Sequence, residues 1–183
     1  MKRRQFFKAS LASGAAIIGL GAGTFLIIDE YDKDSLTIDV ALRSIDALFH
    51  KNIDNLGEWD PAQIFTHCAQ SVEYSMSQFP EHKSNLFKST IGKLAFSAFS
   101  SKGKMTHALN EPIPGAPKLN KKVDAIIALN RLKKSLVDFN NYQGTLAPHF
   151  AYGALTKDEY EAAHVMHLYN HLQEIKRTTR INV

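Results

Sequence analysis

Apolar residues recur at spacings of three and four along most of the chain beyond residue 30. That spacing places side chains on one face of an α-helix, and no stretch of useful length alternates apolar and polar residues as a strand would. Helices are therefore predicted at about 35–55, 61–78, 86–102, 123–143 and 156–176. The pattern predicts an all-α fold, a bundle of four main helices with an accessory helix, over residues 35–177.

Capping residues mark the starts of two of these helices. Asp60 precedes Pro61, and Gln63 lies three residues after the aspartate, which is typical of a helix N-terminus. Thr156 and Glu159 have the spacing of a capping box and open the last helix.

The segment 104–120 separates the third and fourth helices. Pro112, Pro114 and Pro117 exclude regular helix there. We interpret it as a crossover connection between helix ends, with a lid or a pocket wall as the alternative.

The first 30 residues have the composition of a targeting segment. Residues 3–8, RRQFFK, contain paired arginines, one spacer, an apolar pair and a lysine, which resembles the signal of the twin-arginine export pathway. An uncharged stretch follows at 9–28. Residues 1–30 are therefore predicted to be such a signal, with the twin-arginine export machinery as partner.

An uncleaved membrane anchor is the alternative for this segment. Leu11–Ile28 contains 18 residues, about 27 Å as a helix, which just spans a bilayer. No clear Ala-x-Ala cleavage motif precedes Asp29, and the basic end is expected on the inner side. Either interpretation exports the helical domain to the periplasm or to the outer face of the cytoplasmic membrane.

The net charge of +4 does not indicate a nucleic-acid partner. Lys2, Arg3, Arg4 and Lys8 belong to the N-terminal segment, and without these four the 22 basic residues become 18, equal to the 18 acidic ones. No basic block with interleaved aromatic residues follows, so no nucleic-acid role is expected. The single cysteine, Cys68, excludes an intramolecular disulfide and a cysteine-based zinc knuckle.

Three histidines share one face of the last predicted helix. His167 and His171 are four residues apart, the spacing that lets two imidazoles bind one metal ion, and His164 lies on the same stripe. Most divalent-metal sites need a further ligand, and His67 on the second predicted helix is the best candidate. Burying an unpartnered polar group costs about 1–3 kcal/mol, so these imidazoles either bind a metal and hydrogen bonds or face water.

Each histidine also has an ordinary structural interpretation. With eight histidines in the chain, a pair at this spacing arises easily by chance. His149 is interpreted as a hydrogen-bonding loop residue, with a place at the site as the alternative. Cys68 is predicted to be a small buried residue, and Trp59 to pack in the core or as a hydrophobic staple. No role is assigned to His50, His82 and His107.

Three segments of the chain contain distinctive residue patterns. Residues 59–76 contain the pattern W-x-x-x-x-x-x-x-H-x-A-Q-S-x-E-Y-S, which ends at Ser75. Residues 149–156 resemble H-P-x-F-G-x-L-T without its proline, and residues 167–172 resemble H-L-x-H-H-L with Asn170 in place of one histidine. In these three segments the chain is similar to an uncharacterised bacterial family of the DinB-like superfamily. The resemblance runs from about Ser35 to Ile175 with matching order and spacing.

This resemblance implies a DinB-like four-helix bundle that binds a divalent metal, zinc or nickel, through His67, His167 and His171. Characterised members of the superfamily include transferases and isomerases that use low-molecular-weight thiols. Three imidazoles would leave positions open for water or substrate, as catalytic sites do. Tyr74 is then predicted to act as a proton donor or to support a ligand.

Three classes of function remain open. The first is an exported metal-dependent enzyme, a transferase or hydrolase by analogy with the superfamily, whose small-molecule substrate is unknown. The second is a non-catalytic bundle of the cell envelope that acts as a scaffold or sensor. The third is an interaction domain tethered to the membrane through residues 9–28. The oligomeric state is also open, with a dimer as one option.

Overall fold

The computed structural model describes residues 36–49, 52–121 and 123–178, so the predicted signal or anchor at 1–30 lies outside them. Five helices of ten residues or more occur in this part: α2 (Ile38–Phe49), α3 (Pro61–Met76), α5 (Lys93–Lys102), α6 (Ala125–Asn141) and α7 (Lys157–Leu172). A short helix, α4 (Asn85–Phe87), and a π-helical segment, η2 (Lys88–Gly92), precede α5. The all-α class predicted from the periodicity is confirmed.

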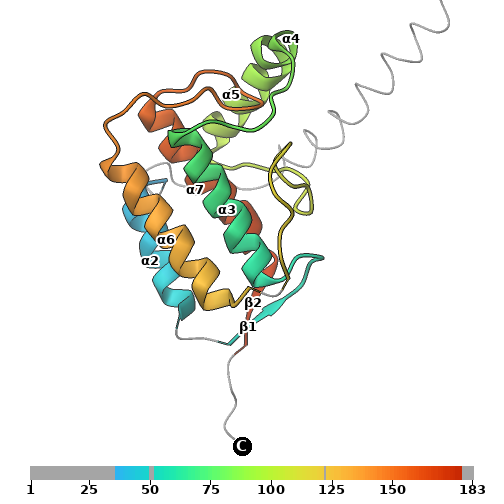
Figure 1. Ribbon diagram of the computed structural model, residues 1–183, viewed down its shortest axis with the longest axis vertical. Coiled ribbons are helices and arrows are strands. Elements are labelled where there is room, and N and C mark those ends of the chain that lie inside the picture. Colours follow the sequence, from blue (N-terminus) through green and yellow to red (C-terminus); the bar gives the residue numbers. More distant parts are fainter. Residues whose placement is uncertain (1–35, 50–51, 122, 179–183) are drawn as a thin grey trace, which may run out of the picture. The chain divides into compact units, whose positions relative to one another are not determined.

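Four of these helices pack side by side as a helical bundle. Helices α2 and α3 each contact both α6 and α7 (Figure 1). Each helix contributes fully buried apolar side chains to the core, for example Ile45, Phe65, Leu132 and Met166. Burial of each such side chain stabilises the fold by about 1.5–3 kcal/mol. Isolated helices of this length are only marginally stable in water, so packing of the core supplies most of their stability.

The predicted caps set the start of α3. The Asp60 carboxylate accepts a hydrogen bond from the Gln63 backbone N–H at 2.8 Å, and the Gln63 side chain accepts one from the Asp60 N–H at 3.1 Å. The same reciprocal arrangement joins Thr156 and Glu159 at the start of α7. Both capping predictions are confirmed, and both caps belong to helices that carry candidate ligands.

Two predicted helices end earlier than their sequence patterns indicate. Helix α2 ends at Phe49 rather than near residue 55, and α7 ends at Leu172 rather than near residue 176. The residues beyond them form strands β1 (Asn52–Asn55) and β2 (Ile175–Thr178), which pair antiparallel with Asn52 opposite Thr178. The predicted C-terminal ends of both helices are therefore wrong, because each strand depends on a partner more than a hundred residues away in the chain.

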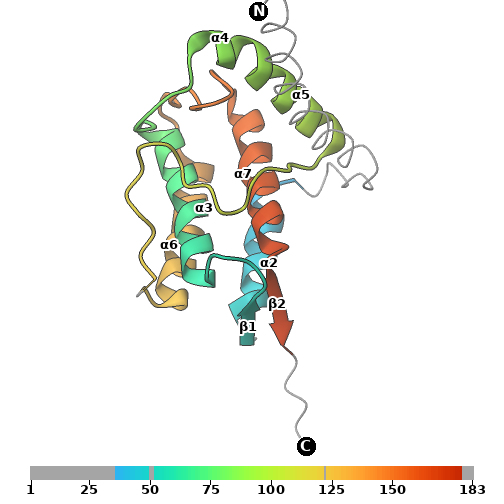
Figure 2. The same cartoon turned by 90° about the vertical axis from the view of Figure 1, so that its right-hand side faces the viewer.

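The segment from α4 to α5 and the loop after it lie against the bundle. Figure 2 shows α4 and α5 at the opposite end of the bundle from β1 and β2. Gly103 ends α5 in the left-handed conformation, with φ of 63°. The loop 104–120 then crosses the face made by α3 and α7, and it contains no helix or strand, as its prolines predict (Figure 2).

Within the part of the chain that the structure describes, none of the helices combines the length and the apolar character that a membrane span requires.

Replacing Asp60 with alanine is expected to lower the free energy of unfolding by about 1 kcal/mol, because the first turn of α3 loses its side-chain acceptor. Urea unfolding of the full chain, followed by circular dichroism, measures the change. Asn130→Ala, at an exposed position in α6, is the control and should change stability by less than about 0.5 kcal/mol. Equal losses in the two variants would contradict the capping role.

Candidate metal centre

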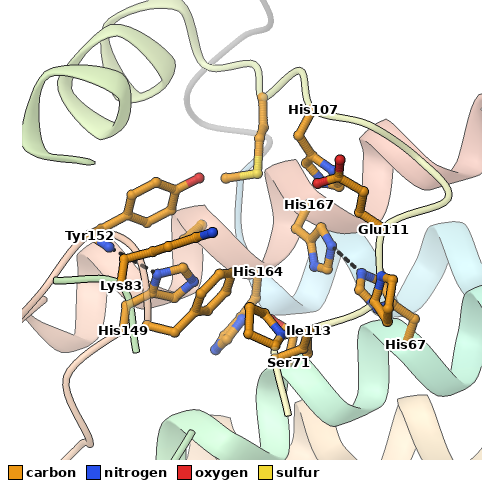
Figure 3. A pocket seen from close by; sticks show the side chains of 15 residues that line it. His67, Ser71, Lys83, His107, Glu111, Ile113, His149, Tyr152, His164 and His167 are labelled. Atoms are coloured by element: carbon orange, nitrogen blue, oxygen red, sulfur yellow. Dashed lines mark hydrogen bonds between the residues drawn. The ribbon is translucent and has the colours of Figure 1, made fainter. Parts of the chain in front are cut away.

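The structure brings the three predicted ligand histidines together between α3 and α7. His67 comes from α3, and His167 and His171 come from successive turns of α7. One ring nitrogen from each residue lies within 4.8 Å of those of the other two. The Nε2 atoms of His67 and His167 are 3.1 Å apart (Figure 3). Three imidazoles that are distant in sequence therefore form one compact group.

Burial leaves several nitrogens of this group without partners. His67 is 3% exposed and His171 is completely buried, whereas His167 is partly exposed. Nδ1 of His67 and both ring nitrogens of His171 have no hydrogen-bond partner among the described residues. Each orphaned polar atom costs about 1–3 kcal/mol. A metal ion would satisfy the convergent nitrogens, so the residues present fit such a group.

The environment keeps the three imidazoles uncharged. Burial, with a smaller effect of the nearby His107, lowers the pKa of His67 to about 3. Burial, followed by the charges that His67 and His107 would carry, lowers the pKa of His171 to about 2. The pKa of His167 is also well below its ordinary value, mainly through burial. Neutral imidazole is the form that binds metal ions, so near neutral pH a metal ion would bind these three residues without displacing a proton from them.

Trp59 holds two of the three rings in place. Its indole stacks on His171 with ring centroids 5.9 Å apart and an interplanar angle of 6°, and it meets His67 edge-on at 4.9 Å. The sequence predicts this tryptophan to pack in the core or as a staple, and it does pack against the core. Its contact with both imidazoles was not predicted, because the residue lies just before α3, outside any helical repeat.

A cavity of about 170 Å³ opens beside the imidazoles. Helices α3 and α7 form one wall, and the loop 104–120 contributes Met105, His107 and Ile113 to the other (Figure 3). The loop is therefore both a crossover connection, as its sequence was interpreted, and a pocket wall, which was the alternative. The volume suits a small molecule rather than a macromolecular segment.

Two further histidines line the cavity, and each has a hydrogen-bond partner outside the three-histidine group. His164 Nε2 lies 3.1 Å from the Ser75 hydroxyl, and its ring stacks on Tyr160. His149 Nδ1 accepts the backbone N–H groups of Ala151 and Tyr152, both at 3.2 Å. The interpretation of His149 as a hydrogen-bonding loop residue is confirmed, and it also reaches the pocket.

Tyr74 and Cys68 lie on α3 away from the cavity wall. The Tyr74 ring packs against Phe79, with centroids 5.8 Å apart, so its role as a proton donor stays a prediction without a contact that supports it. Cys68 is buried, as predicted, and burial raises the pKa of its thiol.

His107 is the site residue that the sequence did not reveal. Its ring centroid lies 5.0 Å from that of His167 and 5.1 Å from that of His171. It belongs to a loop without regular structure, where no periodicity relates it to the ligand helices. Only the tertiary path of the loop brings it to the site.

Comparison with known families places the chain in one of them. A family model described as a protein of unknown function, DUF1569, matches residues 30–178. The chain belongs to the DUF1569 family. No curated protein and no solved structure gives a match. The predicted membership of an uncharacterised family is thus confirmed, and since the description of DUF1569 names no activity, functional inference rests on the site.

The stability of the metal-free protein is expected to fall as the pH drops below about 6.5. Burial lowers the pKa of both His149 and His164 to about 3, so below their ordinary value of 6.5 the unfolded chain takes up protons that the folded chain does not. Each such group lowers the free energy of unfolding by about 1.4 kcal/mol for every pH unit of acidification between its unfolded and folded pKa values.

Urea unfolding in the presence of a chelator, at a series of pH values, tests this expectation. These two groups add little slope above about pH 7.5, where they are almost entirely neutral in both the folded and the unfolded state. A free energy of unfolding that stayed constant from about pH 6.5 to 4.5 would show that these imidazoles accept protons in the folded protein.

Proposed function

We propose that this DUF1569 protein is an exported, DinB-like helical bundle that binds one divalent metal ion, zinc or nickel, through His67, His167 and His171. We further propose that it is an enzyme, a metal-dependent transferase or hydrolase that acts on a small molecule. The function rests on the metal site, and the export rests on the twin-arginine pattern of residues 3–8.

The observation that carries the proposal is the state of His171. This imidazole is completely buried, both of its ring nitrogens lack hydrogen-bond partners among the described residues, and two other imidazoles face it. A bundle that only needed an apolar core would be more stable with a leucine at this position. A bound cation would offset the cost of burying this group, because a metal–nitrogen bond would replace the missing hydrogen bond at the ligating nitrogen.

The donor set agrees with zinc or nickel. Both metals accept imidazole nitrogen, and three protein ligands leave at least one position for water or substrate. When bound, such a cation would supply Lewis acidity toward a carbonyl or lower the pKa of a water or thiol.

The residues of the cavity would bind and shield the substrate. Met105 and Ile113 supply apolar walls that limit access of water, and Ser71 offers a hydroxyl on α3. Lys83 lies at the end of the cavity away from His67, where its ammonium group suits an anionic substituent of the substrate (Figure 3).

Protein purified without added metal is expected to contain about one zinc or nickel ion per chain, and His171→Ala is expected to lose it, because two imidazoles rarely retain a divalent ion. Elemental analysis after gel filtration measures the content. His82→Gln, which removes an exposed imidazole outside the cavity, should keep the ion. Metal-free wild-type protein, or a variant at position 171 with undiminished metal, would remove the basis of the proposal.

Replacing Arg3 and Arg4 together with lysine is expected to abolish export, because the twin-arginine pathway depends on the paired guanidinium groups. Protease added outside spheroplasts should digest the wild-type domain and leave the double variant intact. Lys2→Gln, which keeps both arginines, is the control and should be digested like the wild type. Digestion of all three proteins would show that another route delivers the chain.

A non-catalytic interaction domain is the second candidate function. The segment from α4 to α5 favours it, since Leu86 and Leu94 are 74% and 72% exposed there. Ile91 lies between them in the sequence and is 44% exposed. Several exposed apolar side chains that gather on one surface are typical of a contact with another molecule, whereas single ones are not. Full metal occupancy without turnover on a panel of thiol-transfer and ester substrates would favour this function over the enzyme.

A further inference from the structure

His107 borders the three-histidine group although it comes from a separate part of the chain. Its ring lies about as close to those of His167 and His171, at 5.0 and 5.1 Å, as these two lie to each other, at 4.8 Å. It also lines the same cavity as His67 and His167 (Figure 3). The site therefore contains a fourth imidazole that its three-ligand description leaves without a role.

The hydrogen bonding of His107 leaves one nitrogen able to bind a metal. Nδ1 lies 2.7 Å from the carbonyl oxygen of Ala108, which can only accept, so Nδ1 carries the proton and donates it. Nε2 then holds the lone pair, and this atom is buried without a hydrogen-bond partner among the described residues. Metal-binding histidines commonly donate their other ring N–H to a backbone carbonyl in this manner.

His107 lies on a loop, whereas the other three histidines lie on helices. His67, His167 and His171 stand on capped helices of the bundle, and their nitrogens form the closest group. His107 is not part of that group, and it stands on the loop 104–120, which has no helix or strand. A ligand on such a loop can approach or leave the site at lower cost than a ligand on a packed helix.

We propose that His107 is a fourth, displaceable ligand of the metal ion bound by His67, His167 and His171. The inference rests on the proposed metal site. In the absence of substrate, His107 Nε2 fills the open position, and a donor atom of the substrate replaces it when the cavity is occupied. The exchange breaks one metal–nitrogen bond and forms one bond to the incoming donor, with no net transfer of protons or electrons.

The number of imidazoles around the metal tests the inference directly. Zinc-loaded full-length protein is examined by X-ray absorption spectroscopy at the zinc edge, as the wild type, His107→Gln and His82→Gln. The wild type and His82→Gln should each show four imidazoles, and His107→Gln should show three. The wild-type spectrum alone is informative, so the result does not depend on the folding of a variant.

Anion binding to the cobalt-substituted protein tests whether the fourth ligand can be displaced. Azide binding is followed through the visible absorption of Co²⁺. His107→Gln should bind azide about tenfold more tightly than the wild type, because no internal ligand has to leave first. His82→Gln should bind azide as the wild type does. Equal azide affinity in the wild type and His107→Gln would overturn the proposal.

The outcomes separate this inference from the metal site itself. Three imidazoles in the wild type, with metal still lost in His171→Ala, would overturn the role of His107 and leave the proposed function standing. Wild-type protein that binds no zinc or cobalt would overturn both. Four imidazoles that fall to three only in His107→Gln, with tighter azide binding, would support both.

Discussion

The burial of uncharged imidazoles between α3 and α7 is the constraint on which this site depends. A neutral imidazole has one donor and one acceptor, and both need partners when water is excluded. The bundle provides a partner for His164 through Ser75, and for His149 through two backbone amides. It provides none for His171 among the described residues. The same interior therefore gives His149 and His164 partners outside the three-histidine group, and leaves His67 Nδ1 and both nitrogens of His171 without one among the described residues. Departures of this kind from a well-satisfied core are where functional sites are expected.

Much of the fold follows from local sequence. Helical periodicity predicts the helices, and the side chains of Asp60 and Thr156 set where two of them begin. The pairing of His167 with His171 is also local, because four residues are one turn of helix. The addition of His67 needs the tertiary packing of α3 against α7. Periodicity contributes to that step only by predicting that both helices bury the face carrying their histidines.

The features that the sequence did not reveal depend on contacts between distant segments. Strands β1 and β2 are four residues each, too short to show an alternating pattern, and each would be helical by extension of its neighbour. His107 and Trp59 reach the imidazoles from irregular segments, where no repeat predicts the direction of a side chain. Local propensity therefore predicts the scaffold, while the surroundings of the site follow from the path of its loops.

The pairing of β1 with β2 has a mechanical consequence for the cluster. Strand β2 begins four residues after His171, β1 ends shortly before Trp59, and the Leu56 N–H donates to the Glu174 carbonyl at 2.8 Å beside them. The β1–β2 pair thus links the C-terminal end of α7 to the N-terminal end of α3, near the point where His67 and His171 meet. Force applied to the chain beyond β2 would first act on the hydrogen bonds between β1 and β2. The arrangement of the imidazoles would therefore change before the apolar core of the bundle separates.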